Sequence, residues 1–145
     1  MSQATVVSLP VVVFIHQGHY FALEAAYVRS QGRVCTLEQA QRESVVTVAG
    51  ILDPSAVQSA SVIHYLELAG ATQSSWLGLE QAAELVELPV ADIQALPAVL
   101  QVRRCVPALR ALAWYQGHVL NLLDARVVLQ NLRPHQYIST HFKRV

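Results

Sequence analysis

Six histidines and two cysteines are the residues of this chain whose types could support metal or redox chemistry. His16 and His19 could share an ion if the turn between them were tight, but no third ligand stands near them. Cys35 and Cys105 lie far apart and form no C-x-x-C pair, so neither a zinc knuckle nor a redox dithiol is indicated. We therefore expect no metal site, no cofactor and two buried free thiols.

Catalytic patterns are the next candidates. The chain has no G-x-S-x-G motif, no glycine-rich phosphate loop, and no histidine placed to activate Cys35. Glu80, Glu84 and Glu87 have the spacing of one helix face, but without basic or metal-binding neighbours they indicate a solvated face. The sequence therefore predicts no catalytic residues and a protein that is not an enzyme.

The amino-acid composition also excludes some classes of protein. Hydrophobic residues make up 53% of the 145 residues and charged ones only 14%, which excludes a disordered chain. Ten basic residues balance ten acidic ones, so the positive excess typical of nucleic-acid-binding proteins is missing. Because so few charges are available to cover the surface, some apolar area is expected to remain exposed, which favours protein contacts.

The balanced charge is unevenly distributed along the chain. Residues 45–102 contain acidic side chains and no Lys or Arg, whereas residues 103–145 are rich in bases and contain one acid, Asp124. Either these segments lie side by side and neutralise one another, or they meet differently charged partners. The sequence leaves both possibilities open.

The N-terminal segment bears on cellular location. It has no basic region before its apolar run, and that run, Leu9–Ile15, is too short to span a bilayer. We therefore expect a cytoplasmic protein without membrane insertion.

Two β-hairpins are the strongest secondary-structure prediction. In the first, an apolar strand over Val6–Ile15 is followed by His16-Gln17-Gly18-His19 and a strand over Tyr20–Leu23. In the second, strands over Arg110–Tyr115 and His118–Leu123 flank another Gln-Gly pair. Both patterns are typical of an antiparallel sheet.

Shorter elements are expected between the hairpins. Thr36 and Gln39 form a capping-box pattern that predicts a short helix over Thr36–Ser44. Glu80–Leu88 fits a helix or a strand, and Val90–Leu100 is predicted to be a connection with room for one helical turn. Further strands are predicted over Val45–Leu52, Ser61–Leu68 and Trp76–Leu79. Many short strands with frequent turns favour a barrel or a sandwich.

A weak internal repeat supports two similar subdomains. Tyr20–Ala26 and Trp76–Ala83 share an aromatic residue, a small residue, Leu and Glu in register. Two related β subdomains would explain the match, and chance similarity is the alternative.

Eight segments form an ordered series along the chain: Val11–Phe14, Phe21–Arg29, Gly78-Leu79, Glu84–Pro89, Asp92-Ile93, Leu96-Pro97, Arg110–Ala113 and Gly117–Asp124. Taken in this order, they resemble the CheW-like chemotaxis adaptor family. The first two resemble the opening of its first barrel, and the other six follow the order of its second barrel. Three places depart from the family pattern: Glu43–Pro54 has no Arg-Gly pair, Ser30 replaces a glutamate, and Gln81-Ala82 replaces a Val-Asp pair.

The resemblance implies a mainly β fold of two SH3-like β-barrel subdomains with short helices. One CheW-like domain would fill residues 1–145, with subdomains at about 5–70 and 71–130 and a basic C-terminal tail over 131–145. It implies a non-catalytic adaptor that links a CheA-like histidine kinase with methyl-accepting chemoreceptors, in chemotaxis or in a type IV pilus pathway. The alternative is a stand-alone SH3-like barrel that binds protein partners outside chemotaxis.

Four residues are candidates for partner binding. Val28 matches the strand valine of the family pattern, so the resemblance implies a contact role for it. Tyr27, Trp114 and Tyr115 are candidates by residue type, because aromatic side chains dominate contact energies. The alternative for each is core packing, which we expect above all for Trp114 in its hairpin strand.

Overall fold

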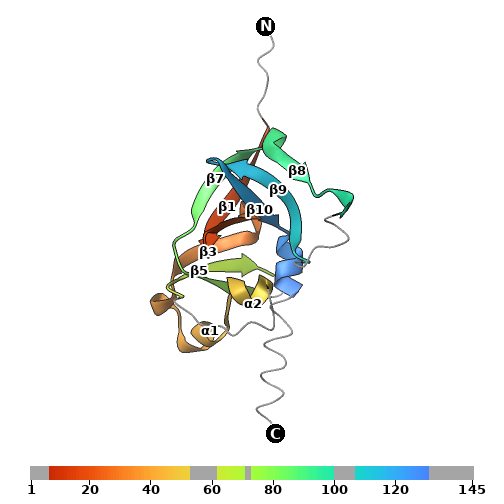
Figure 1. Ribbon diagram of the computed structural model, residues 1–145. Coiled ribbons are helices and arrows are strands. Elements are labelled where there is room, and N and C mark those ends of the chain that lie inside the picture. The colour runs from red at the N-terminus through yellow and green to blue at the C-terminus, as the bar shows by residue number, and fades with distance from the viewer. Residues whose placement is uncertain (1–6, 53–61, 71–72, 100–106, 131–145) are drawn as a thin grey trace.

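The computed structural model describes residues 7–52, 62–70, 73–99 and 107–130, and these form a mainly β protein (Figure 1). Its strands are β1 (Ser8–His16), β2 (His19–Glu24), β3 (Val28–Arg33), β4 (Val45–Thr47), β5 (His64–Ala69), β6 (Ser74–Leu79), β7 (Glu84–Pro89), β8 (Ile93–Ala95), β9 (Leu109–Tyr115) and β10 (His118–Leu123). The short helices are α1 (Gln39–Glu43) and α2 (Val48–Leu52), with 3-10 turns η1 (Ala25–Tyr27), η2 (Val34–Thr36) and η3 (Val90–Asp92), and residues 125–130 are helical.

The strands form two sheets. A six-stranded sheet has the order β7-β1-β2-β10-β9-β8, and a four-stranded sheet has the order β3-β5-β6-β4. In Figure 1 the six-stranded sheet curls on itself and lies above the four-stranded one. Strands from both sides of residue 70 contribute to the six-stranded sheet, because β1 pairs with β7 and β2 pairs with β10. The predicted subdomain boundaries stay a prediction. Strand β1 is apolar on both faces, so it is stable only inside a sheet that is covered on both sides.

Both predicted hairpins are confirmed. Their turns have the same conformation, with φ of 49° at Gln17 and 78° at Gly18, and 50° at Gln116 and 77° at Gly117. Two successive residues with positive φ make a type I′ turn, whose twist suits an antiparallel pair. Strands β2 and β10 then pair in parallel, which brings the two turns to the same end of the sheet.

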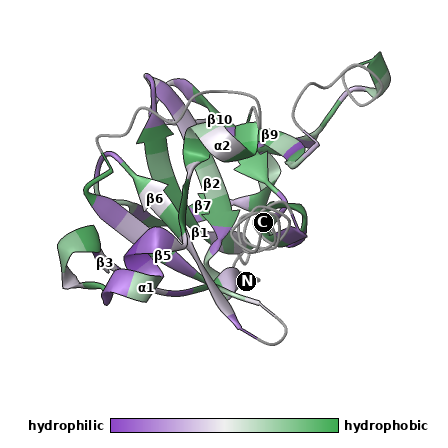
Figure 2. Cartoon of the chain, turned by 90° about the horizontal axis from the view of Figure 1, so that it is seen from below, coloured by the Kyte–Doolittle hydropathy of each residue, from purple (hydrophilic) through white to green (hydrophobic). Residues whose placement is uncertain are grey.

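Strand β1 contributes to two hydrophobic cores. Val11 and Val13 lie on the concave face of the six-stranded sheet, and Val12 and Phe14 lie in the core between the sheets. All four are at most 6% exposed, because alternate side chains of a strand point to opposite faces. Figure 2 shows the contrast between hydrophobic β1 and β2 and the hydrophilic helix α1.

The helix predicted from Thr36 begins later. Its box is made by Glu38, whose backbone N–H donates to Gln41 Oε1 at 3.1 Å, and the helix starts at Gln39. The Thr36 hydroxyl donates instead to the Arg33 carbonyl at 2.6 Å, which closes the 3-10 turn η2. A capping box is present as predicted, but its first residue is Glu38 and not Thr36, two residues later in the chain.

The strand predicted over Val45–Leu52 is wrong beyond Thr47. The Gly50 N–H donates to the Thr47 hydroxyl at 3.2 Å, so Thr47 caps helix α2 at its N-terminus. Val48 and Ile51 of this helix are buried in the core between the sheets. The ambiguous segment Glu80–Leu88 contains a strand, β7.

The structural repeat differs from the predicted one. Strand β2 leads through η1 into β3, and β7 leads through η3 into β8. Val28 and Ile93 occupy matching positions, with φ/ψ of −97°/117° and −95°/128°. The predicted match instead aligns β2 with β6, but β6 is followed by strand β7 and not by a 3-10 turn.

The cysteines also differ from expectation. Cys35 is exposed in η2, so the prediction of a buried thiol was wrong for it. Cys105 and the basic tail over 131–145 lie outside the described residues.

Candidate protein-contact site

Tyr27 and Val28 lie where the chain passes from one sheet to the other. Tyr27 ends η1 and Val28 begins β3, so they connect the six-stranded sheet to the four-stranded one. Both are half-buried and pack against the core between the sheets. Val28 is aligned with Leu68 of β5, and the register shifts between Val28 and Ser30. These two candidates are therefore partly structural and partly accessible.

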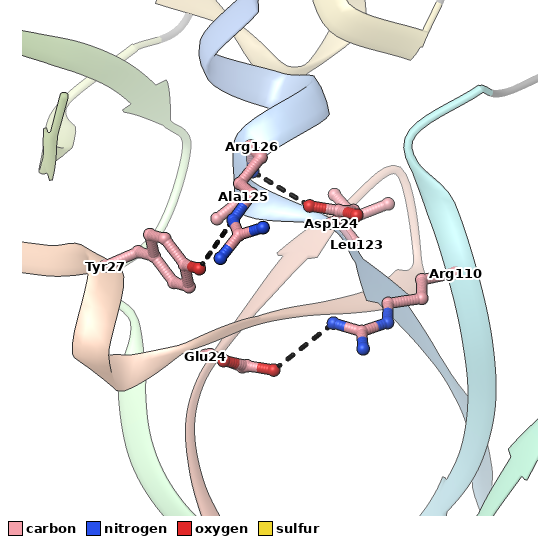
Figure 3. A pocket seen from close by; sticks show the side chains of 7 residues that line it. All are labelled: Glu24, Tyr27, Arg110, Leu123, Asp124, Ala125 and Arg126. Carbon is pink, nitrogen blue, oxygen red and sulfur yellow. Dashed lines mark hydrogen bonds and ion pairs between the residues drawn. The ribbon is translucent and has the colours of Figure 1, made fainter. Parts of the chain in front are cut away.

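A polar cavity of about 400 Å³ opens beside Tyr27 (Figure 3). Arg126 Nε donates to the Tyr27 hydroxyl at 3.1 Å, and Arg110 Nη1 lies 3.5 Å from Glu24 Oε1. The Arg126 backbone N–H donates to Asp124 Oδ1 at 2.9 Å, which caps the helix of residues 125–130. Two guanidinium groups and two carboxylates thus face one opening.

The charges of this cavity can exchange partners. The Arg110 side chain is 65% exposed and its ion pair with Glu24 is screened by solvent, so the pair contributes little to stability. A charged side chain from another protein could replace either member at small cost. Among the residues that line the cavity, no nucleophile is paired with a positioned base.

Trp114 lies on the surface, so the expectation that it packs in the core was wrong. It is 58% exposed on β9, and its cross-strand partner Val119 on β10 is 48% exposed. With Leu112 and Gln94 they line a shallow hollow of about 90 Å³. We call these four residues the outer patch. The neighbour Ala113 faces the concave core, so strand alternation turns Trp114 outward.

Tyr115 points the other way, toward the concave face. Its hydroxyl donates to Glu84 Oε2 at 3.0 Å, and its ring lies 6.0 Å from that of Tyr20. Burial, together with this hydrogen bond, raises the pKa of Tyr115. The four sequence candidates therefore fall in three places: the sheet junction, the outer patch and the end of the concave face.

Several residues of these surfaces were not among the sequence candidates. Val119 and Leu112 share a face with Trp114, and alternation along the second hairpin could have identified them. Glu24 and Arg126 are far apart in sequence and meet only through the packing of β2 against β10, so no local pattern marks them.

Metal and membrane features can be assessed over the described ranges. Within them, no group of three or more His, Cys, Asp or Glu side chains could hold a metal ion. His16 Nδ1 lies 3.9 Å from Glu80 Oε1, and this pair has no third member there. Among the helices of the same ranges, none is long and apolar enough to cross a membrane.

Comparisons with known proteins place the fold. No family model matches the sequence, and no curated protein matches it. Among solved structures, the scaffolding protein TtCheW from Thermoanaerobacter tengcongensis is similar, with a TM-score of 0.59 over 81% of this chain and 89% of that one. The chain has a CheW-like fold. Sequence identity is 10%, so the likeness lies in the arrangement of the strands.

The CheW-like fold confirms the predicted class, a mainly β protein of two packed β units with short helices. It also accounts for the order of segments in the sequence. Strand β1, the β7–η3–β8 unit and the closing β9–β10 hairpin correspond to the segments on which the resemblance rested. Residues 43–52, where the Arg-Gly pair is missing, form the end of α1, β4 and α2.

Proposed function

We propose that this protein is a non-catalytic CheW-like adaptor that links a CheA-like histidine kinase with methyl-accepting chemoreceptors or related pilus chemosensory proteins. Its place would be a cytoplasmic chemotaxis or type IV pilus pathway. The observation that carries the proposal is the fold shared with a scaffolding protein over most of both chains.

The surfaces of the molecule are consistent with an adaptor, which must hold two partners at once. The cavity beside Tyr27 is polar and charged, whereas the outer patch around Trp114 is largely apolar. Both surfaces include residues of β9 and β10, but they share no lining residue. An exposed tryptophan beside a valine supplies the aromatic anchor on which interface energy usually depends. We assign one partner to each surface.

Titration calorimetry against the kinase regulatory domain and the receptor tips from the same source tests the proposal. We expect both to bind, and Trp114→Ala to weaken one of them by about tenfold or more, as for an interface anchor. The matched control is Leu85→Ala, because Leu85 is an equally exposed apolar residue, 67% exposed, outside the outer patch. Its affinities should equal those of the wild type.

The polar cavity and the adjoining sheet junction are tested by Arg110→Glu and Val28→Glu. Val28 packs on the core, so its variant is informative only if its melting temperature is close to that of the wild type. Arg110 is largely exposed, and its reversal of charge leaves the core intact. Loss of the second partner in either folded variant supports the assignment.

A stand-alone barrel that binds other proteins is the second candidate. Two observations favour this candidate: the missing Arg-Gly pair and the 10% identity to TtCheW. If neither kinase domain nor receptor tips bind at about 100 μM, the chemosensory proposal is wrong and this candidate stands.

A further inference from the structure

A second cavity, of about 390 Å³, lies at the end of the six-stranded sheet that carries the two Gln-Gly turns. It is separate from the polar cavity and from the outer patch, and shares no lining residue with either. The register shows which side chains it receives. Glu84 is opposite Val13 and Tyr20 is opposite Ile15, and Val13 faces the concave core. Glu84 therefore points to the concave side.

Aromatic rings gather at this opening. The Tyr20 ring lies 6.0 Å from the Tyr115 ring at an interplanar angle of 59°, and 4.7 Å from the His118 ring at 21°. Tyr20 and Tyr115 both pack on the edge of the concave core. The faces of tyrosine rings carry negative potential, so two of them at an angle attract a cation placed within about 6 Å of both centroids.

A carboxylate stands beside these rings without a cation. Glu84 Oε2 accepts the Tyr115 hydroxyl at 3.0 Å, and within the described part of the chain Glu84 makes no ion pair. The cavity is lined by no Lys or Arg. Glu24, at the other cavity, is by contrast paired with Arg110. The opening thus combines two tyrosine rings with a carboxylate, and no Lys or Arg lines it.

From this geometry we infer that the cavity binds an alkylammonium group, with Tyr20 and Tyr115 contacting its methyl or methylene groups and Glu84 balancing its charge. The volume is within the range of small-molecule sites, roughly 300 to 1,000 Å³. The same chemistry is offered by a free amine and by a lysine side chain of another protein. The site adds a ligand to the adaptor without depending on its kinase or receptor partners.

Titration of the labelled protein with choline, followed by NMR, tests the inference. The control ligand is 3,3-dimethylbutanol, which has the same shape without the charge. We expect choline to shift the ring signals of Tyr20 and Tyr115 at millimolar concentration, and the neutral alcohol to bind at least about fivefold more weakly, as loss of a cation–π contact requires. Equal binding of the two ligands would overturn the inference.

Three substitutions test whether choline binding depends on the charge of Glu84. Glu84→Gln keeps the shape of the side chain and should weaken choline binding by about twofold to fivefold, the usual worth of an exposed charge pair. Glu87→Gln is the matched control, because Glu87 lies on the same strand and is exposed on the opposite face. Tyr115→Phe keeps the ring and frees Glu84, so it should retain binding. An unchanged affinity in Glu84→Gln contradicts the inference.

A second ligand, the blocked peptide acetyl-Gly-Lys-Gly amide, distinguishes a lysine side chain from a free amine as the natural ligand. Tighter binding of this peptide than of choline identifies a lysine side chain, and tighter binding of choline identifies a free amine. If neither shifts Tyr20 or Tyr115 up to about 100 mM, a concentration that would saturate any specific site, the cavity has no such ligand.

Discussion

The two hairpins of the six-stranded sheet share one turn and differ in what covers them. Both have a Gln-Gly turn with nearly identical φ values. On β1 and β2, Val12, Phe14 and Phe21 are less than 10% exposed, because the four-stranded sheet packs over them. On β9 and β10, the same face of the sheet carries Trp114 and Val119, which are about half exposed.

The difference shows that turn residues determine the hairpin, whereas tertiary contacts determine burial. An aromatic residue at the same kind of strand position is a core residue in one hairpin and a surface residue in the other. An uncovered apolar face that continues from a core is the feature expected of a protein contact. The outer patch is therefore the surface of the second hairpin on which the proposed protein contact rests.

The largest expected effect concerns the aromatic residues of the two hairpins. Phe14→Ala should lower the free energy of unfolding by about 3 to 5 kcal/mol, since Phe14 is 1% exposed and a cavity would remain. Trp114→Ala should change it by less than about 1 kcal/mol, as for a surface site. Urea denaturation of both variants measures this contrast. Similar losses in the two would show that Trp114 is a core residue.

The turns should respond alike. Gly18→Ala and Gly117→Ala each place a Cβ at a φ near +78°, where open space surrounds the turn and only backbone strain acts. Each should cost about 1 to 2 kcal/mol in thermal or urea unfolding. Asn at either position should cost less, because Asn tolerates positive φ. Unequal costs would mean that the shared turn is not equally important to both hairpins.

The smallest expected effect concerns Glu67 on β5 of the four-stranded sheet, a polar site that contrasts with the apolar outer patch. Hydrogen bonds from the Ser74 and Ser30 hydroxyls, at 2.5 and 2.7 Å, lower the pKa of Glu67 from its ordinary 4.5. A lowered pKa in the folded state stabilises the protein above pH 4.5, and this contribution is lost as the pH falls through the folded value.

Glu67→Gln should therefore reduce stability at pH 7 by less than about 1 kcal/mol, since solvent screens the site. It should also make the loss of stability below pH 4.5 less steep. Urea midpoints between pH 7 and pH 3 measure both. A variant with an unchanged pH dependence would contradict the role of these hydrogen bonds.

Local patterns predicted the elements that depend on short-range chemistry. The two hairpins were predicted from β-branched runs around Gln-Gly pairs, and the strands near Ser61–Leu68 and Trp76–Leu79 were confirmed as β5 and β6. The ordered likeness to CheW-like domains predicted the fold class, which the structural comparison confirms. These signals need only local sequence or its order.

Tertiary contacts determine the features that the local sequence did not predict. Val48–Leu52 is rich in β-formers, but it forms a helix because Thr47 caps it and Val48 and Ile51 pack between the sheets. The exposure of Trp114 depends on where the four-stranded sheet ends, which no spacing in the second hairpin encodes. The contact roles of Tyr27, Val28, Trp114 and Tyr115 stay predictions.

The most direct test of the central claim uses the two tryptophans of the chain as reporters. Trp114 lies in the outer patch and Trp76 lies on β6 of the other sheet. When labelled protein is titrated first with the kinase regulatory domain and then with the receptor tips, the indole N–H signal of Trp114 should shift with one partner while that of Trp76 stays in place. If either partner binds tightly and neither moves the Trp114 signal, the outer patch is not an adaptor contact.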